Sequence, residues 1–210
     1  MDKPIVFILF GKPGSGKESA RTILLEHIKR TYGKTAFFSD SGLLFRLTIN
    51  QEGCVPSLND FHLKRVTEIQ SSGALQTSAL ATLMWMNHFT QHYNGEQFII
   101  MDGSPRREPE VLTFLQHFRE FYNAEIQIMH IDVTDEVAIE RMVARQQKNP
   151  ERIETQTPEA LQKRMQDFRE KNLSAFTNMT KFYEVKTVYT IDNNGSLDAL
   201  EKQITAIKFV

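Results

Sequence analysis

Cysteine is nearly absent from this chain, which has 210 residues and a single cysteine, Cys54. One cysteine excludes an intrachain disulfide and a zinc site of four thiolates. An excess of either charge is also missing, because 25 lysines and arginines face 26 acidic residues, so no broad basic face for nucleic acid is expected. Long apolar runs are lacking as well, since PIVFILF at 4–10 is too short to span a membrane. We expect one cytoplasmic domain with no nucleic-acid or membrane partner.

A glycine-rich loop directly follows this apolar run. Residues 5–19 read IVFILFGKPGSGKES, which predicts a strand, a loop and the start of an amphipathic helix. Four residues separate Gly11 from Gly16, and Lys17 comes next, which is the spacing of a phosphate-binding loop. Glycines let successive backbone N–H groups turn toward an anion, and the N-terminus of the helix attracts the same charge. The alternative is a plain turn that joins the strand to the helix.

Apolar segments alternate with helical patterns along the whole chain. Strands are expected at 4–10, 35–38, 97–101, 126–131 and 185–191, and helices at about 17–31, 109–121, 135–147, 158–181 and 196–208. The alternation predicts an α/β fold with a parallel sheet covered by helices on both faces. Almost sixty residues separate the second and third strands, too many for an ordinary crossover, so they predict an inserted subdomain.

Three motifs carry a resemblance to a known family. They are GKPGSGKES at 11–19, DGSPR at 102–106 and RMVAR at 141–145. They are similar to GxPGxGKGT, DGFPR and RxxxR of the adenylate kinase and nucleoside monophosphate kinase family, and the resemblance covers essentially the whole chain. It implies a three-layer α/β/α P-loop NTPase fold with a five-stranded sheet, and a monomer. Its parts would be a core at about 1–39, 94–145 and 158–210, a helical monophosphate-binding insertion at about 40–93, and a short lid at about 146–157.

The resemblance also implies site residues, with ATP as phosphoryl donor and Mg²⁺ as cofactor. Residues implied to bind ATP are Gly11, Pro13, Gly14, Ser15, Gly16, Lys17, Glu18, Ser19 and Arg141. Ser19 and Asp102 are implied to support Mg²⁺, through its water shell. Residues implied to bind the acceptor are Ser41, Gly42, Arg46, Gln76, Gly103, Arg106 and Glu110. The catalytic cations implied are Lys17, Arg106, Arg145, Arg152 and Arg164, and arginine suits this task because its fork stays charged and binds oxygen pairs.

Some of these residues also have a plain structural interpretation. Arg141 and Arg145 share a helix face with acidic neighbours and fit a solvated ion-pair face. Asp102 follows an apolar strand and fits a capping residue. The segment 146–157 fits an ordinary surface loop. His88 and His92 are four residues apart, but no third ligand is evident, so we interpret them as ordinary helical histidines.

Besides Ser19, which stands where the family has threonine, four positions depart from the family pattern. Glu18 stands where the family has glycine, Leu43 where it has aspartate, and Ser104 where it has phenylalanine. Glu110 stands where the family has the glutamine that reads the acceptor adenine. An ionised glutamate only accepts hydrogen bonds, whereas guanine offers two adjacent donors and cytosine one amino group. Alternatively, Glu110 turns to solvent and backbone groups near 75–77 hold the base.

The function implied is an ATP-dependent nucleoside monophosphate kinase. AMP is the expected acceptor on family grounds, and Glu110 admits GMP or CMP. One alternative is a P-loop kinase of a small non-nucleotide hydroxyl substrate, because the same loop serves sugar and shikimate kinases. The other is an inactive ATP-binding protein, in which the changes at Glu18, Leu43 and Ser104 have abolished turnover.

Overall fold

The computed structural model describes residues 3–50, 52, 58–148, 157–181, 183, 185 and 187–209. Cys54, Arg152 and most of the expected lid at 146–157 lie outside these residues. Within the described part of the chain, none of the helices has the length and apolar character needed to cross a bilayer.

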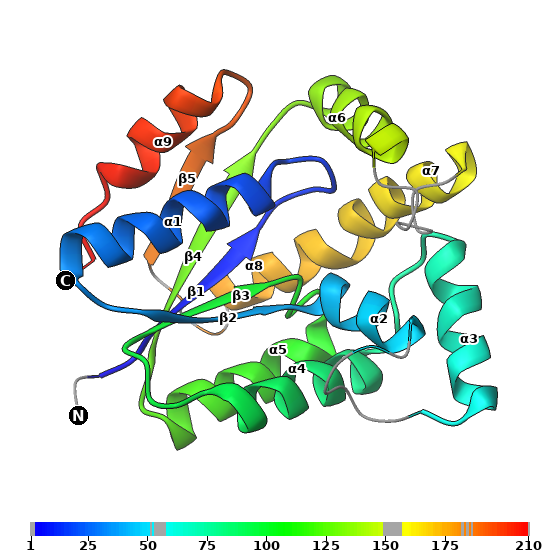
Figure 1. Ribbon diagram of the computed structural model, residues 1–210, viewed down its shortest axis with the longest axis horizontal. Helices are drawn as coiled ribbons and strands as arrows, with labels where there is room; N and C mark the ends of the chain where they lie inside the picture. The colour runs from blue at the N-terminus through cyan, green and yellow to red at the C-terminus, as the bar shows by residue number, and fades with distance from the viewer. Residues whose placement is uncertain are drawn as a thin grey trace.

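A five-stranded parallel sheet runs through the centre of the molecule (Figure 1). Its strands are β1 (Ile5–Phe10), β2 (Ala36–Asp40), β3 (Phe98–Asp102), β4 (Glu125–Asp132) and β5 (Thr187–Asp192). They lie in the order β2-β3-β1-β4-β5, and every neighbouring pair is parallel. The α/β fold predicted from the alternating segments is confirmed, and the strand ends differ from the predicted ends by one or two residues.

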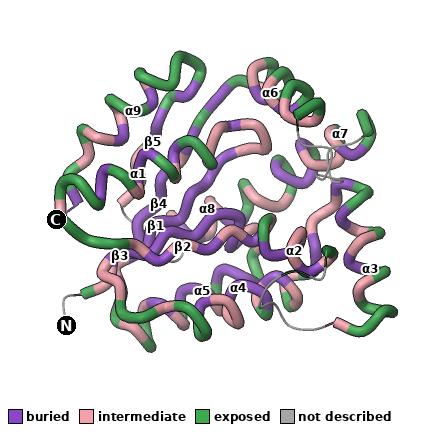
Figure 2. The backbone as a smooth tube through the Cα atoms, in the orientation of Figure 1, coloured by how far each residue is buried: buried purple, intermediate pink, exposed green. Residues whose placement is uncertain are grey.

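Helices cover both faces of this sheet (Figure 1). On one face lie α1 (Lys17–Tyr32) and α9 (Leu197–Thr205), which pack on Ile5, Phe7 and Leu9 of β1. On the other face lie α4 (Ser78–His92), α5 (Glu108–Leu115) and α8 (Leu173–Lys181), which pack on Val6, Ile8 and Phe10. Every residue of β1 is therefore buried, as Figure 2 shows, and this explains why the strand is a continuous apolar run.

Two helices that the sequence predicts as continuous contain a π-helical turn. The segment predicted at 109–121 is α5 followed by η1 (Gln116–Phe121). The segment predicted at 158–181 is α7 (Pro158–Asp167), then η3 (Phe168–Asn172), then α8. The wider turn changes the register of the helix, and each π turn contains one phenylalanine, Phe118 or Phe168, that is buried in the core. The remaining helix of the core is α6 (Asp135–Lys148).

The insertion between β2 and β3 consists of α2 (Ser41–Ile49), α3 (Asp60–Ser71) and α4. Its helices share a small apolar cluster of their own: Leu44, Phe45, Val66, Ala81 and Met84. The second half of α4 leaves this cluster, because Trp85 and Phe89 are fully buried in the core beneath the sheet. The helix α4 thus packs in both the insertion and the core.

A second attachment lies between α3 and α4, at Leu75. The Leu75 N–H donates to Asp167 Oδ2 of α7 at 3.0 Å, and the Leu75 carbonyl accepts from Arg107 Nη2 at 2.9 Å. Asp167 is 1% exposed and is neutralised by Lys163 at 3.2 Å and Lys171 at 2.5 Å. The loop that ends the insertion is therefore bonded to the core on two sides.

Gly73 of this loop provides a test of how closely it packs on α7. Gly73 has φ +76°, and a Cβ there would lie 2.3 Å from the Ala160 carbonyl oxygen. Gly95 has φ +89° but would place its Cβ in open space. Both alanine substitutions strain the backbone, and only Gly73→Ala adds a clash. We expect Gly73→Ala to lower the free energy of unfolding by about 2 kcal/mol more than Gly95→Ala in urea denaturation. Equal losses would contradict this close packing.

Candidate active site

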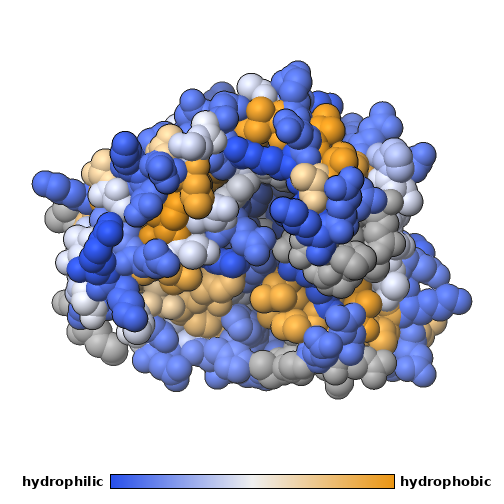
Figure 3. Space-filling view, turned by 45° about the horizontal axis from the view of Figure 1, so that its top comes forward, coloured by the Kyte–Doolittle hydropathy of each residue, from blue (hydrophilic) through white to orange (hydrophobic). Residues whose placement is uncertain are grey.

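A polar cleft lies at the carboxyl ends of β1, β2 and β3. Parallel strands bring their following loops to the same edge of a sheet, and this edge is where α/β proteins bind ligands. Figure 3 shows the hollow, with hydrophilic side chains around it. The walls come from the phosphate loop, the insertion, the β3–α5 turn, α6 and α7. Segments far apart in the sequence therefore contribute to one site.

Most of the predicted site residues line this cleft. They are Pro13, Gly14, Ser15, Gly16, Lys17, Glu18, Ser41, Gly42, Arg46, Gln76, Asp102, Gly103, Arg106, Glu110, Arg145 and Arg164. Gly11 lines a smaller adjoining hollow, and Ser19 is exposed on the first turn of α1, outside the lining. Six further residues line the cleft without having been predicted as site residues: Asp40, Phe45, Gln70, Ala74, Leu75 and Ala81.

The phosphate loop is held in place from β5. Asn193, at the end of β5, donates from Nδ2 to the Ser15 carbonyl at 2.7 Å. Gly16 has φ +87°, and a Cβ there would lie 2.3 Å from the same Nδ2, so only glycine fits. Arg141 Nη1 would be 3.8 Å from that Cβ, which places this guanidinium beside the loop. The buried Ser15 hydroxyl has no hydrogen-bond partner among the described residues.

Lys17 is folded back on the loop that precedes it. Its Nζ donates to the Gly11 carbonyl at 2.7 Å and to the Lys12 carbonyl at 3.1 Å. Burial lowers the pKa of Lys17 to about 8; the nearby Asp102 opposes this shift and Arg106 adds to it. An anion in the cleft would favour the charged ammonium, so the loop and its lysine fit a phosphate group well.

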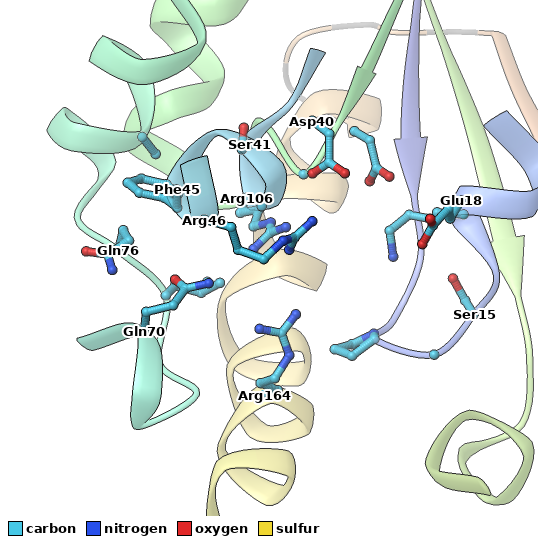
Figure 4. Close-up of a pocket in the computed structure, with 18 of the residues that line it drawn as sticks. Ser15, Glu18, Asp40, Ser41, Phe45, Arg46, Gln70, Gln76, Arg106 and Arg164 are labelled. Atoms are coloured by element: carbon cyan, nitrogen blue, oxygen red, sulfur yellow. The ribbon is translucent and has the colours of Figure 1, made fainter. Parts of the chain in front are cut away.

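Two carboxylates end the neighbouring strands β2 and β3. Asp40 and Asp102 are paired in the register of these strands. Asp102 is 7% exposed, and burial followed by the charge of Asp40 raises the pKa of Asp102 to about 6. Asp40 caps α2 by accepting from the Leu43 N–H at 3.1 Å, and it faces Arg21 at 3.7 Å. Figure 4 shows the Asp40 carboxylate at the edge of the cleft.

The positions that depart from the family pattern have clear places in the structure. The Ser104 hydroxyl is 2.7 Å from the Ser41 hydroxyl, and this buried hydrogen bond joins the β3–α5 turn to the start of α2. Leu43 is 39% exposed, and the carboxylate in this turn of the chain is that of Asp40. Glu18 is exposed at the rim of the cleft.

Cationic side chains meet in the middle of the cleft. Arg46 comes from α2, Arg106 from the β3–α5 turn and Arg164 from α7, and Figure 4 shows their guanidinium groups pointing toward one another. Arg145 of α6 also lines the cleft. Guanidinium groups repel one another, so such a convergence is typical of sites that bind phosphate oxygens.

Glu110 lies at the end of the cleft that the insertion covers. It is 2% exposed, and its Oε2 accepts from the Arg106 N–H at 2.8 Å. Burial raises the pKa of Glu110, and the hydrogen bond from Arg106 opposes that shift. The alternative in which Glu110 turns to solvent is therefore wrong. The nearby backbone groups of Leu75 are also already bonded, to Asp167 and Arg107.

Two glutamines of the insertion differ in direction at this end. The Gln76 amide donates from Nε2 to the Val66 carbonyl at 2.8 Å, and Figure 4 shows it pointing away from Arg46 and Arg106. Gln70 is 6% exposed, and its amide extends toward the arginines. Gln70 is therefore the glutamine whose side chain faces the cleft.

The two strand-end carboxylates could hold a hydrated divalent cation. Among the described residues, no group of three histidine, cysteine or acidic side chains is arranged to enclose a metal ion. Mg²⁺ prefers oxygen ligands and keeps several of its waters. Asp40 and Asp102 supply hard oxygen atoms next to Lys17, so their chemistry fits a hydrated Mg²⁺ that also contacts phosphate.

The chain is similar to adenylate kinases along nearly all of its length. It is 24% identical over 207 residues to an adenylate kinase of Flavobacterium johnsoniae, and the match covers 97% of each chain. It is 27% identical over 193 residues to an adenylate kinase of Flavobacterium psychrophilum, covering 89% of this chain and 92% of the relative. No protein-family model matches it. The family resemblance drawn from the motifs is thereby confirmed.

The buried carboxyl group of Asp102 makes the stability of the folded protein depend on pH. Its pKa in the folded protein, about 6, lies above the ordinary value of 3.8. The folded state therefore loses stability as the pH rises from about 4 to about 6, because burial opposes ionisation. At pH 7.5 we expect Asp102→Asn to raise the unfolding temperature by roughly 5 °C.

At pH 4 the same substitution should have almost no effect, because Asp102 is then mostly protonated. The control is Asp198→Asn, which removes an exposed carboxylate from the first turn of α9. An equal gain for Asp102→Asn at pH 4 and pH 7.5 would contradict the assignment. Thermal denaturation followed by circular dichroism measures both variants.

Proposed function

We propose that this divergent relative of the adenylate kinases is an ATP-dependent nucleoside monophosphate kinase. The observation that carries the proposal is the meeting of a phosphate loop with arginines from α2, the β3–α5 turn, α6 and α7 in one cleft. Phosphoryl transfer between two phosphate-bearing substrates needs alignment and neutralisation of charge more than covalent help from the protein. A cleft with cations on both sides of its centre suits that reaction.

The donor side is the phosphate loop. Its backbone N–H groups and the N-terminus of α1 would hold the outer phosphates of ATP. Lys17 would leave the Gly11 and Lys12 carbonyls for the phosphate oxygens, and its charge would then follow the transferred group. Arg141, beside Gly16, would add a charge at the outer edge of the loop.

The acceptor side lies under the insertion. Arg46 and Arg106 point into the cleft opposite the loop and would clamp the acceptor phosphate. Two guanidinium groups would bind two oxygens of the acceptor phosphate and fix its orientation. The third oxygen could then face the donor. Ser41 and Gly42 begin α2 at the same place, where the helix N-terminus favours an anion.

Negative charge on the transferred phosphoryl group would be neutralised by arginines and by Mg²⁺. Arg145 and Arg164 reach the cleft from α6 and α7, which flank the predicted lid at 146–157. Asp40 and Asp102 would hold Mg²⁺ through its waters. Bound there, Mg²⁺ would supply positive charge that neutralises the phosphate oxygens during transfer. The terminal phosphoryl group of ATP would pass to an acceptor phosphate oxygen, and ADP would leave with the bridging oxygen.

An acceptor panel tests the proposal. ADP formation is measured from ATP and Mg²⁺ with AMP, GMP, CMP, UMP or dTMP, and in a blank without acceptor. We expect turnover that depends on at least one nucleoside monophosphate and exceeds the blank by about 100-fold or more. Saturable ATP binding without any such turnover would contradict it and favour the inactive nucleotide-binding protein. Turnover with a sugar or shikimate alone would favour the hydroxyl kinase.

The substitution Lys17→Ala tests whether Lys17 has a specific role, beyond the loss of one positive charge from the protein. We expect kcat to fall by about 1,000-fold or more, because the positive charge that accompanies the phosphoryl group is lost. The control is Lys29→Ala, which removes an exposed lysine from the last turn of the same helix and should leave kcat unchanged. A Lys17→Ala enzyme with a rate close to the wild-type rate would contradict the proposed mechanism. Steady-state kinetics at saturating acceptor measure the difference.

A further inference from the structure

The end of the cleft beside the insertion has the polar groups needed to recognise a nucleotide base. Glu110 from α5 and Gln70 from α3 both line the cleft, and both are more than nine-tenths buried. Within the described residues the Gln70 side chain makes no hydrogen bond, although Figure 4 shows its amide extending into the cleft. The amide is open to the cleft, so it can both donate to and accept from a ligand with polar edges.

Glu110 is held in a fixed position in this subsite. Its Oε2 accepts from the Arg106 N–H at 2.8 Å, and the Ser78 side chain also hydrogen-bonds to the carboxylate. Burial raises the pKa of Glu110, while the charges of Arg106 and Arg107 oppose that shift and favour the ionised form. The ionised carboxylate has no hydrogen to donate, so the base edge that meets it must supply the donors.

The common bases differ in what they offer to such a group. Adenine and cytosine each present an amino group next to a ring nitrogen that only accepts, and this lone pair would face the carboxylate. Uracil and thymine present one N–H between two carbonyl oxygens. Guanine presents N1–H and the 2-amino group side by side, which suits two carboxylate oxygens. The Gln70 amide can then donate to the O6 or N7 acceptor of the same base.

We propose that Glu110 and Gln70 select a guanine nucleoside monophosphate as the phosphoryl acceptor. This inference rests on the proposed kinase function and names its acceptor. It differs from the expectation of AMP that the family resemblance implies. The phosphate end of the cleft keeps its arginines, while the proposed base end combines the buried carboxylate of Glu110 with the amide of Gln70.

The first measurement compares GMP, IMP, AMP and CMP with the full chain at pH 8, which favours the carboxylate. We expect kcat/KM for GMP to exceed that for AMP by at least about 100-fold, because adenine leaves the buried acceptors unmatched. IMP keeps N1–H but lacks the 2-amino group, so its value should lie between those of GMP and AMP. A kcat/KM for AMP equal to or above that for GMP overturns the proposal.

The second measurement exchanges the hydrogen-bonding character of the carboxylate. Glu110→Gln keeps an oxygen that accepts from the Arg106 N–H and adds an amide that can donate to adenine N1. We expect the ratio of AMP to GMP kcat/KM to rise by at least about 100-fold. The matched control is Glu108→Gln, the same change at an exposed position in the first turn of the same helix. Equal ratios for the two variants overturn the proposal.

Failure of the kinase function is distinguished by binding. The dissociation constants of GMP and AMP are measured by isothermal titration calorimetry for the wild type and both variants, and thermal unfolding confirms that each is folded. Tighter binding of GMP by the wild type, reversed only in Glu110→Gln, supports the base subsite even if no acceptor gives turnover. Binding of AMP as tight as that of GMP overturns it, whether or not the enzyme is active.

Discussion

The arrangement of this protein depends on keeping charge balanced inside a buried cleft. The central strand β1 is covered on both faces, so the loop that leaves it begins in an environment where an isolated charge is costly. Lys17 meets this constraint by bonding to two loop carbonyls, and Asp102 meets it through a raised pKa and the cations around it. In the proposed reaction, the phosphate oxygens of a bound ester would take the place of the two carbonyls that Lys17 contacts.

The same constraint ties the site to the packing of the insertion. Arg46 belongs to α2, so its position in the cleft depends on how the insertion sits on the core. Trp85 and Phe89 anchor α4 beneath the sheet, and the Leu75 backbone is bonded to Asp167 and Arg107. These attachments lie outside the proposed chemistry, yet they connect the two sides of the cleft. Positioning of this kind is what phosphoryl transfer chiefly requires.

The two ends of the cleft depart from the family pattern to different degrees. At the phosphate end, the loop and the arginines are present. Leu43 has no carboxylate where the family has one, but Asp40 places a carboxylate in the same turn. At the base end, a buried glutamate stands at the position of a neutral glutamine, and Gln70 adds a second polar group. The proposed reaction with an altered acceptor would accommodate this contrast, since phosphate chemistry and base recognition would use separate residues.

Local pattern alone determined the strands, the phosphate loop and the helix after it, because backbone spacing and burial periodicity within a short segment specify them. The motifs also predicted Lys17, Arg106 and Asp102 as residues of one site, and all three line the same cleft. Tertiary structure decided what spacing does not encode: that Asp40 lies beside Asp102, that the Gln70 amide faces the cleft while the Gln76 amide turns to Val66, and that Glu110 is buried. The π turns at Phe118 and Phe168 were likewise decided by the tertiary structure. Side-chain direction and burial depend on packing between segments far apart in the chain, so they are settled only when the whole fold assembles.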